Sequence, residues 1–186
     1  MKYELTNEKK EFLDRTLYRI RAVKDFELCD GTIIHAGELG GWIEKEYNLS
    51  QEGSAWVFGE ARVYGEAWVF GEARVCGEAQ VYGEAQVFGK ARVYGEARVY
   101  GKALVSGEAD IFKTEHYIVI GPVGSRNSFT TFYRNADNDI SVSCGCFCGN
   151  LDAFLHAVEK THGDSRHGLV YKKAAELAKL QIDLEG

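Results

Sequence analysis

The sequence predicts a mainly β protein in which a parallel β-solenoid built from hexapeptides precedes a small α+β domain. Gly53–Phe112 consists of ten near-identical hexapeptides of the form G-E-A-R-V-Y. In each unit an Ala and a Val, replaced by Ile111 in the last, are two residues apart, so both face the same side of an extended strand. The hexapeptides stop after Phe112, and the change in composition there indicates a second domain.

A short fixed period is typical of a solenoid because one unit cannot bury its own apolar edge and needs a stacked neighbour. A helix is excluded, since a period of six residues does not match the helical period. A glycine in every unit would also cost a helix about 1 kcal/mol each relative to alanine. We therefore expect an N-terminal cap with the solenoid at 1–113 and the α+β domain at 114–186.

The aromatic position of the hexapeptide predicts outward-facing columns. If three units make a coil, residues 18 apart stack roughly 4.8 Å apart. Two columns are then rich in rings, and we call them the tyrosine column (Tyr64, Tyr82, Tyr100) and the phenylalanine column (Phe70, Phe88). Stacked rings stabilise adjacent coils by about 0.5–1 kcal/mol per pair. A contiguous exposed aromatic stripe also indicates a subunit or domain interface, and the two interpretations are compatible.

The turn position predicts charged edges between the faces. Its columns are Glu60, Glu78 and Glu96; Glu66, Glu84 and Lys102; and Glu72, Lys90 and Glu108. Single carboxylates spread along an edge lack the ligand cluster that a metal ion needs, so we expect a solvated edge and no metal.

Before the repeat, Thr6 or Asn7 is expected to cap a short helix that buries Phe12, Leu13 and Leu17. Alternation over Tyr18–Ala22 then predicts a strand. Asp30 and Gly31 predict a hairpin turn before Ile33 and Ile34.

After the repeat, strands are expected at 117–120, 129–133 and 140–147. A helix should begin at Asn150 or Asp152 and run to Thr161, with Gly163 just beyond its C-terminus. A second helix should begin near Asp164 or Ser165.

The loop 121–127 is the strongest candidate for ligand binding. Two glycines allow backbone N–H groups to converge on an anion, and Arg126 adds a bidentate donor for phosphate or carboxylate. An ordinary turn between two strands is the competing interpretation. A second polar cluster lies between the helices, and a cationic pocket forms if the two meet. The candidate ligand-binding residues are Gly121, Gly124, Ser125, Arg126, Asn127, Thr130, Arg134, His162, Arg166 and His167.

Cys144, Cys146 and Cys148 are expected on one face of the third strand. A zinc site with His156, His162 or His167 is an alternative, but same-face residues on a strand fan out, so we favour packing under the helices. The five cysteines suit a reducing cytosol rather than a disulfide framework.

The overall composition narrows the function classes. A formal net charge of −6 argues against duplex nucleic acid as the main partner. The start of the chain is polar, and no run of about 18 apolar residues occurs, so we expect a soluble cytoplasmic protein without a membrane contact. No nucleophile elbow, P-loop, H-E-x-x-H or dinucleotide fingerprint is present, and we expect no catalytic residues and no cofactor.

Leu39–Val57 reads L-G-G-W-I-E-K-E-Y-N-L-S-Q-E-G-S-A-W-V and leads into the G-E-A-R-V-Y units. Together, over roughly Tyr18–Phe112, they resemble phage- and prophage-encoded hexapeptide-repeat proteins of the left-handed β-helix superfamily. The resemblance implies a left-handed parallel β-helix with three hexapeptides per triangular coil, often assembled as a trimer. The runs G-P-V-G-S-R-N, S-C-G-C-F-C-G and T-H-G-D-S-R-H resemble a C-terminal region of uncharacterised phage and bacterial proteins.

The leading hypothesis is a non-enzymatic phage accessory protein, a dimeric or trimeric scaffold that inhibits a host process such as anti-phage defence. Its partner is either a host protein or an anionic, nucleotide-like small molecule sequestered near Arg126. A pure oligomerisation module and an acyltransferase-like enzyme are the alternatives. Acyltransferases of this superfamily use a histidine on or near the coils, whereas the repeat has none and His35 and His116 flank it.

Overall fold

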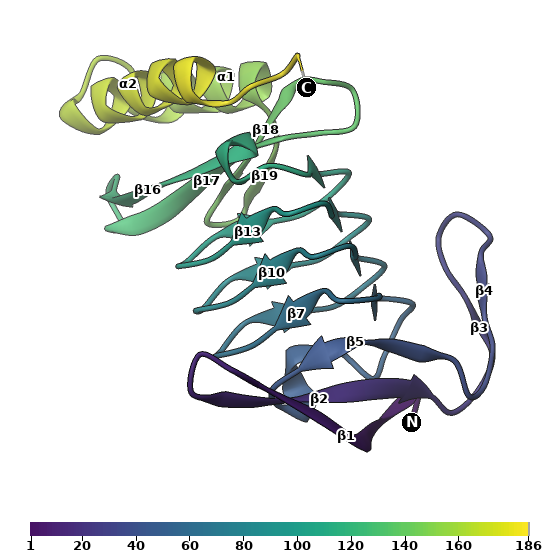
Figure 1. Cartoon of the computed structure of the whole chain (residues 1–186). Coiled ribbons are helices and arrows are strands. Elements are labelled where there is room, and N and C mark those ends of the chain that lie inside the picture. Colours follow the sequence, from purple (N-terminus) through teal and green to yellow (C-terminus); the bar gives the residue numbers. More distant parts are fainter. Residues whose placement is uncertain (186) are drawn as a thin grey trace.

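The computed structural model describes residues 1–185, and its centre is a parallel β-solenoid closed at both ends by other parts of the chain (Figure 1). Strands one coil apart pair in parallel, with Val81 opposite both Val63 and Val99. This confirms the 18-residue coil of three hexapeptides. The repeat strands are β6 (Trp56–Val57), β7 (Arg62–Val63), β8 (Trp68–Val69), β9 (Arg74–Val75), β10 (Gln80–Val81), β11 (Gln86–Val87), β12 (Arg92–Val93), β13 (Arg98–Val99), β14 (Leu104–Val105) and β15 (Asp110–Ile111).

Each coil contributes one strand to each of three faces, which we name by their strands: β7–β10–β13, β8–β11–β14 and β6–β9–β12–β15. The Ala and Val columns fill the interior and have essentially no exposed surface. At each corner a glycine takes a positive φ, for example 71° at Gly77, a conformation that favours a residue without a Cβ. The predicted assignment of inside and outside positions is therefore confirmed.

The N-terminal end is a β-structure rather than the expected helix. β1 (Tyr3–Phe12) and β2 (Arg15–Ala22) form an antiparallel hairpin, and β5 (Leu39–Ile43) pairs with β2 and then in parallel with β7. The helix prediction is wrong because pairing with β2 overrides the local capping signal of Thr6 and Asn7. Leu13, expected to be buried, is an exposed turn residue with φ 48°.

The other N-terminal predictions agree better with the structure. β3 (Phe26–Glu27) and β4 (Ile33–Ile34) form the expected hairpin around Gly31, and the strand expected at Tyr18–Ala22 lies within β2. Figure 1 shows the β3–β4 hairpin standing beside the coils. A short 3₁₀ helix, η1 (Glu46–Asn48), then leads into the first coil.

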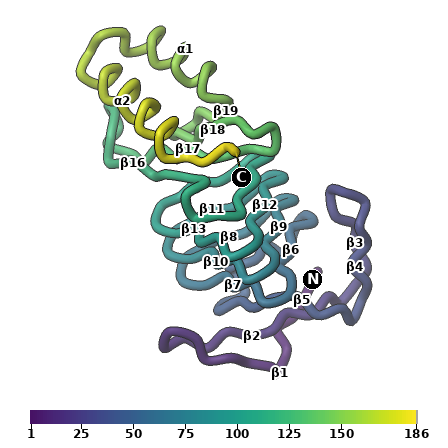
Figure 2. Tube along the Cα trace, turned by 45° about the horizontal axis from the view of Figure 1, so that its top comes forward, coloured from purple at the N-terminus to yellow at the C-terminus, as the bar shows by residue number. Residues whose placement is uncertain are grey.

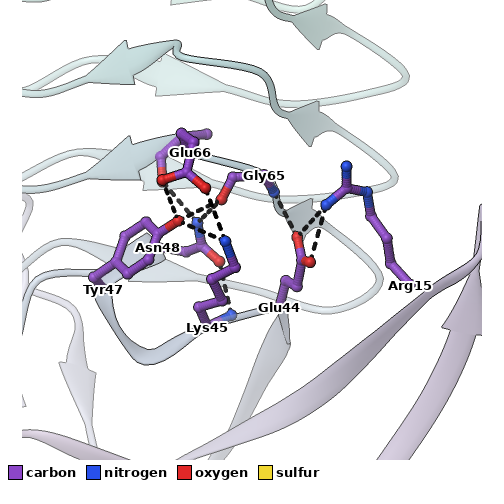
Figure 3. A network of polar contacts seen from close by, with 8 residues as sticks. Arg15, Glu44, Lys45, Tyr47, Asn48, Gly65 and Glu66 are labelled. Atoms are coloured by element: carbon purple, nitrogen blue, oxygen red, sulfur yellow. Dashed lines mark hydrogen bonds and ion pairs between the residues drawn. The ribbon is translucent and has the colours of Figure 1, made fainter.

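Side-chain donors close the first coil. Lys2 Nζ donates to the carbonyl oxygen of Ala55 at 2.8 Å, and Asn48 Nδ2 donates to that of Ala67 at 2.8 Å. Around Asn48, Glu44 accepts from the N–H of Gly65 at 2.7 Å and from Arg15, while Lys45 pairs with Glu66 (Figure 3). No coil precedes these carbonyls to donate hydrogen bonds to them, so the buried side chains of Lys2 and Asn48 donate instead.

The C-terminal unit packs a four-stranded antiparallel sheet against two helices. The strands are β16 (Tyr117–Val123), β17 (Ser128–Arg134), β18 (Ile140–Cys144) and β19 (Phe147–Asn150), and η2 (Thr114–His116) precedes them. α1 (Leu151–His162) and α2 (Arg166–Gln181) cover the sheet, with Asn150 and Ser165 as N-caps, as expected (Figure 2). The single strand expected at 140–147 is instead a hairpin, because Gly145 takes φ 60° and turns the chain.

Hydroxyl acceptors close the last coil. Leu104 N–H donates to Thr131 Oγ1 at 2.9 Å, and Tyr100 N–H donates to the hydroxyl of Tyr117 at 3.1 Å. Arg98 N–H donates to Thr114 Oγ1 at 3.2 Å. Within residues 1–185, no helix is long and apolar enough to cross a membrane.

The corner glycines give a matched test of the stacking. A Cβ added to Gly77 would lie 3.0 Å from backbone atoms of Gly95 in the next coil. A Cβ added to Gly101 would have no atom within 4 Å. Both have a φ near 70°, so each alanine variant pays about 1–2 kcal/mol for that conformation. We expect Gly77→Ala to lower the free energy of unfolding more than Gly101→Ala in urea denaturation. Equal losses would show that the corners are not in close contact.

The buried amine of Lys2 predicts a pH dependence. Burial, reinforced by Lys24, lowers the pKa of Lys2 to about 8, whereas an unfolded lysine titrates near about 10.4. Between these values the unfolded chain binds more protons at this residue, so its contribution to stability rises with pH. From pH 8 to 10 we expect the stability of the wild type relative to Lys2→Met to rise by up to about 2 kcal/mol. Urea denaturation of both proteins at several pH values measures this difference in the free energy of unfolding. A difference that does not change with pH would contradict the prediction.

Candidate functional site

A hollow of about 260 Å³ lies in the C-terminal unit where two hairpin turns meet the two helices. We call it the Arg126 hollow. The turn between β16 and β17 contributes Ser125 and Arg126, and the end of β18 contributes Cys144. Phe154 and His162 come from α1, and Tyr171 comes from α2. The structure thus brings three predicted ligand residues together: Ser125, Arg126 and His162.

The first turn is held in place by Tyr171 of α2. A Cβ at Gly124 would lie 1.8 Å from the Tyr171 hydroxyl, and Gly124 takes φ 75°. Glycine is therefore required here for packing as well as for backbone conformation. Asn127 N–H donates to the carbonyl of Gly124 at 3.3 Å, so this N–H serves the turn rather than a nest for an anion.

Two polar groups that line the hollow, Cys144 and Tyr171, contact each other, and Cys144 also contacts the buried Thr130. Thr130 Oγ1 donates to Cys144 Sγ at 3.1 Å, and Cys144 Sγ lies 3.8 Å from the Tyr171 hydroxyl. Burial, with the adjacent Cys144, raises the pKa of Tyr171 to about 12, and the charge of Arg126 acts in the opposite direction. The tyrosine is therefore a neutral hydroxyl at physiological pH and can donate one hydrogen bond.

The mouth of the hollow is cationic and uncompensated. Arg126 is exposed, and among the described residues neither Arg126 nor His162 makes an ion pair. The ring of His167 lies 6.1 Å from that of His162, although His167 and Arg166 do not line the hollow. A guanidinium without an acidic partner beside hydroxyl and imidazole groups suits a small anion.

Arg134 does not belong to this site, contrary to the expected pocket of cations. It is buried, donates to Asp110 Oδ2 at 2.6 Å, and packs over the ring of Phe112 at 4.9 Å. Asp110 lies in β15, so the pair connects the C-terminal sheet to the last coil. Sequence spacing gave no sign of this contact, because the two residues come from different units.

The other predicted residues near this loop are packed against the rest of the C-terminal unit. A Cβ at Gly121 would meet Phe129 and the carbonyl of Ser128, and Thr130 is buried beneath the hollow. The three cysteines are not on one strand face: Cys146 is exposed in the turn, and Cys148 contacts Ser106 at 3.2 Å. In residues 1–185, no group of three His, Cys, Asp or Glu side chains is placed to hold a metal.

The aromatic columns stack as expected. Tyr64 and Tyr82 are parallel with centroids 5.0 Å apart, and Phe70 and Phe88 are 4.8 Å apart. Tyr64 is 5% exposed because Phe12 of the β1–β2 hairpin packs on it, with the ring centroids 5.7 Å apart. At the other end, Tyr100 meets Tyr117 edge to face. The chain itself therefore covers part of the tyrosine column.

Tyr171 is the site residue that the sequence analysis missed. It shares a helical face with Ala174, Ala175 and Ala178, which are buried. A tyrosine within an apolar stripe carries a hydroxyl group into the core, where it usually has a polar partner. This pattern in the sequence could have identified Tyr171.

Comparison with known proteins supports the solenoid. A family model described as the YdcK beta solenoid repeat matches residues 91–107, which lie within the hexapeptides. The match covers roughly one coil and does not extend into the C-terminal unit. No curated protein matches the sequence.

The buried Arg134–Asp110 pair gives a testable contrast with an exposed pair. Asp110→Ala leaves a buried guanidinium without its partner, which typically costs about 3–5 kcal/mol. Glu176→Ala removes an exposed pair with Lys173, for which we expect under about 1 kcal/mol. Thermal and urea unfolding of the two variants measure the difference. Similar losses would show that Arg134 does not hold the C-terminal unit on the last coil.

Proposed function

We propose that this chain is a non-enzymatic binding protein whose solenoid is a scaffold and whose Arg126 hollow binds a small anion. The observation that carries the proposal is the convergence of Arg126, His162, Ser125 and the Tyr171 hydroxyl on one hollow. Among the described residues no carboxylate neutralises the guanidinium. A phosphate or carboxylate there would accept charge-assisted hydrogen bonds, which are about twice as strong as neutral ones.

The volume of the hollow limits the ligand. About 260 Å³ is slightly below the roughly 300–1,000 Å³ typical of sites that bury a whole drug-sized ligand. The phosphate end of a nucleotide fits this size better than a complete nucleotide. We therefore propose that the hollow holds the anionic group while any base and sugar lie outside it.

The biological setting of the proposal comes from the resemblance to phage- and prophage-encoded hexapeptide-repeat proteins. It implies a left-handed winding, the cytoplasm of an infected bacterium, and several copies in one assembly. Sequestration of a nucleotide-like signal would then inhibit a host process such as anti-phage defence. Direct binding to a host protein is the second form of the same proposal, and the exposed rings of Trp68 and Tyr100 favour it.

The positions of His35 and His116 favour binding over an acyltransferase-like activity. His116, next to the last coil, is buried and packs edge to face on Phe112 with centroids 4.2 Å apart. Its burial lowers its pKa, and its Nδ1 faces the N–H of Phe112 at 3.4 Å. His35 is on the β3–β4 hairpin beside Asp25. Turnover of acetyl-CoA above background would favour the enzymatic alternative.

Calorimetric titration with inorganic phosphate and with a nucleoside triphosphate tests the ligand site. We expect Arg126→Ala to weaken binding roughly tenfold or more, since a hydrogen bond to a charged group contributes about 1.5–3 kcal/mol. Arg166→Ala is the matched control, because it removes an exposed arginine that does not line the hollow. Absence of binding at millimolar ligand, or equal affinity of Arg126→Ala and the wild type, would reject the site.

A further inference from the structure

The three faces of the solenoid differ in charge. The variable position of the hexapeptide places Arg62 and Arg98 on the β7–β10–β13 face and Arg74 and Arg92 on the β6–β9–β12–β15 face. The β8–β11–β14 face has no charged residue at either outward strand position: it carries Trp68, Phe70, Gln86, Phe88, Leu104 and Ser106. Trp68 is 41% exposed, and beside it Tyr47 is 44% exposed.

The chain covers the lower parts of the other two faces. The β1–β2 hairpin packs on Tyr64, and the β3–β4 hairpin packs on Trp56, with the rings of Phe26 and Trp56 5.3 Å apart. The β8–β11–β14 face instead bears an open hollow of about 670 Å³ between Tyr47, Leu49, Trp68 and Gln86. Glu46 and Glu66 line the rim of this hollow. The face is therefore aromatic and accessible at the first two coils, whereas at the last coil Ser106 is buried under the C-terminal sheet.

The two edges of this face carry complementary charges. From the first coil to the last, one edge carries Glu66, Glu84 and Lys102, and the other carries Glu72, Lys90 and Glu108. Lys90 and Glu108 are exposed, and neither makes an ion pair among the residues described. Cys29 contacts the carbonyl of Glu72 at 3.9 Å, so the β3–β4 hairpin reaches the lowest position of that edge but not the two above it.

We propose that the β8–β11–β14 face docks on a second copy of this chain with the two solenoid axes parallel. Rotation about an axis parallel to the solenoid keeps every coil at its height and brings one edge against the opposite edge of the neighbour. Glu84 and Lys102 already pair with each other within the chain at 3.6 Å. Docking adds Lys90 beside Glu84 and Glu108 beside Lys102, so that the four side chains alternate in charge. The remaining pair is Glu66 and Glu72, where Lys45 already neutralises Glu66 at 2.8 Å.

An antiparallel arrangement centred on the middle coil brings together only one pair of opposite charges, Glu66 and Lys102. It brings each edge against itself, so that Glu84 faces Glu84 and Lys90 faces Lys90. Like charges in juxtaposition disfavour that docking. The parallel assembly also places both C-terminal units at the same end, which would present two Arg126 hollows side by side.

This inference rests on the proposed scaffold role but not on the ligand site, and matched arginine substitutions test it. Gln86→Arg puts a charge at the centre of the docking face, and Gln80→Arg makes the same change on the β7–β10–β13 face. The repeat accepts arginine at this position elsewhere, so both variants should fold. By light scattering we expect assembly in the wild type and Gln80→Arg, and its loss in Gln86→Arg. A monomeric wild type at all concentrations, or equal effects of the two substitutions, would overturn the proposal.

Charge reversal tests the parallel orientation. Lys90→Glu should weaken the assembly by about tenfold, and adding Glu84→Lys to it should restore the affinity. Glu78→Lys, on the edge away from the face, should leave the affinity unchanged. Failure of the double variant to recover would exclude the parallel docking. Arg126→Ala should assemble normally, so failure of the ligand site is distinguishable from failure of this interface.

Discussion

The structure depends on a coil-to-coil hydrogen-bond ladder that has a direction. N–H groups of each coil donate to carbonyls of the next, as Trp68 does to Ala85 at 2.9 Å and Phe70 to Val87 at 3.1 Å. The first coil is therefore left with unpaired acceptors and the last with unpaired donors. Buried backbone groups without partners are costly, so the two ends need opposite kinds of cap.

The flanking segments meet this need with matching chemistry. At the first coil the caps are donors, the amine of Lys2 and the amide of Asn48. At the last coil they are hydroxyl acceptors, Thr114, Tyr117 and Thr131. An uncapped end would present a row of free backbone groups to other chains. Closed at both ends, the solenoid cannot lengthen by stacking on another copy, and association through a side face is the route that stays open.

Prediction from sequence succeeded where one local period determined the outcome. The interior Ala and Val columns, the stacking of Tyr64 on Tyr82 and the corner glycines all follow from the six-residue repeat. It failed where distant segments meet. Thr6 and Asn7 gave a capping signal that pairing between β1 and β2 overrode, and the partner of Arg134 lies in another unit. Whether Arg126 and His162 meet was likewise left open by the sequence, and the contact of Tyr171 with the turn at Gly124 was not predicted.

The uniform interior also explains where the specific features of this protein lie. Every coil buries the same Ala and Val, so the core distinguishes neither one face nor one coil from another. Differences are confined to outward positions and to the ends. Arginines at these positions mark two faces, and aromatic and amide side chains mark the third. The C-terminal unit that caps the last coil carries the Arg126 hollow. A scaffold of this kind separates stability from recognition, because outward substitutions leave the hydrogen-bond ladder intact. Side chains at the outward positions and in the C-terminal unit can therefore differ without any change in the core.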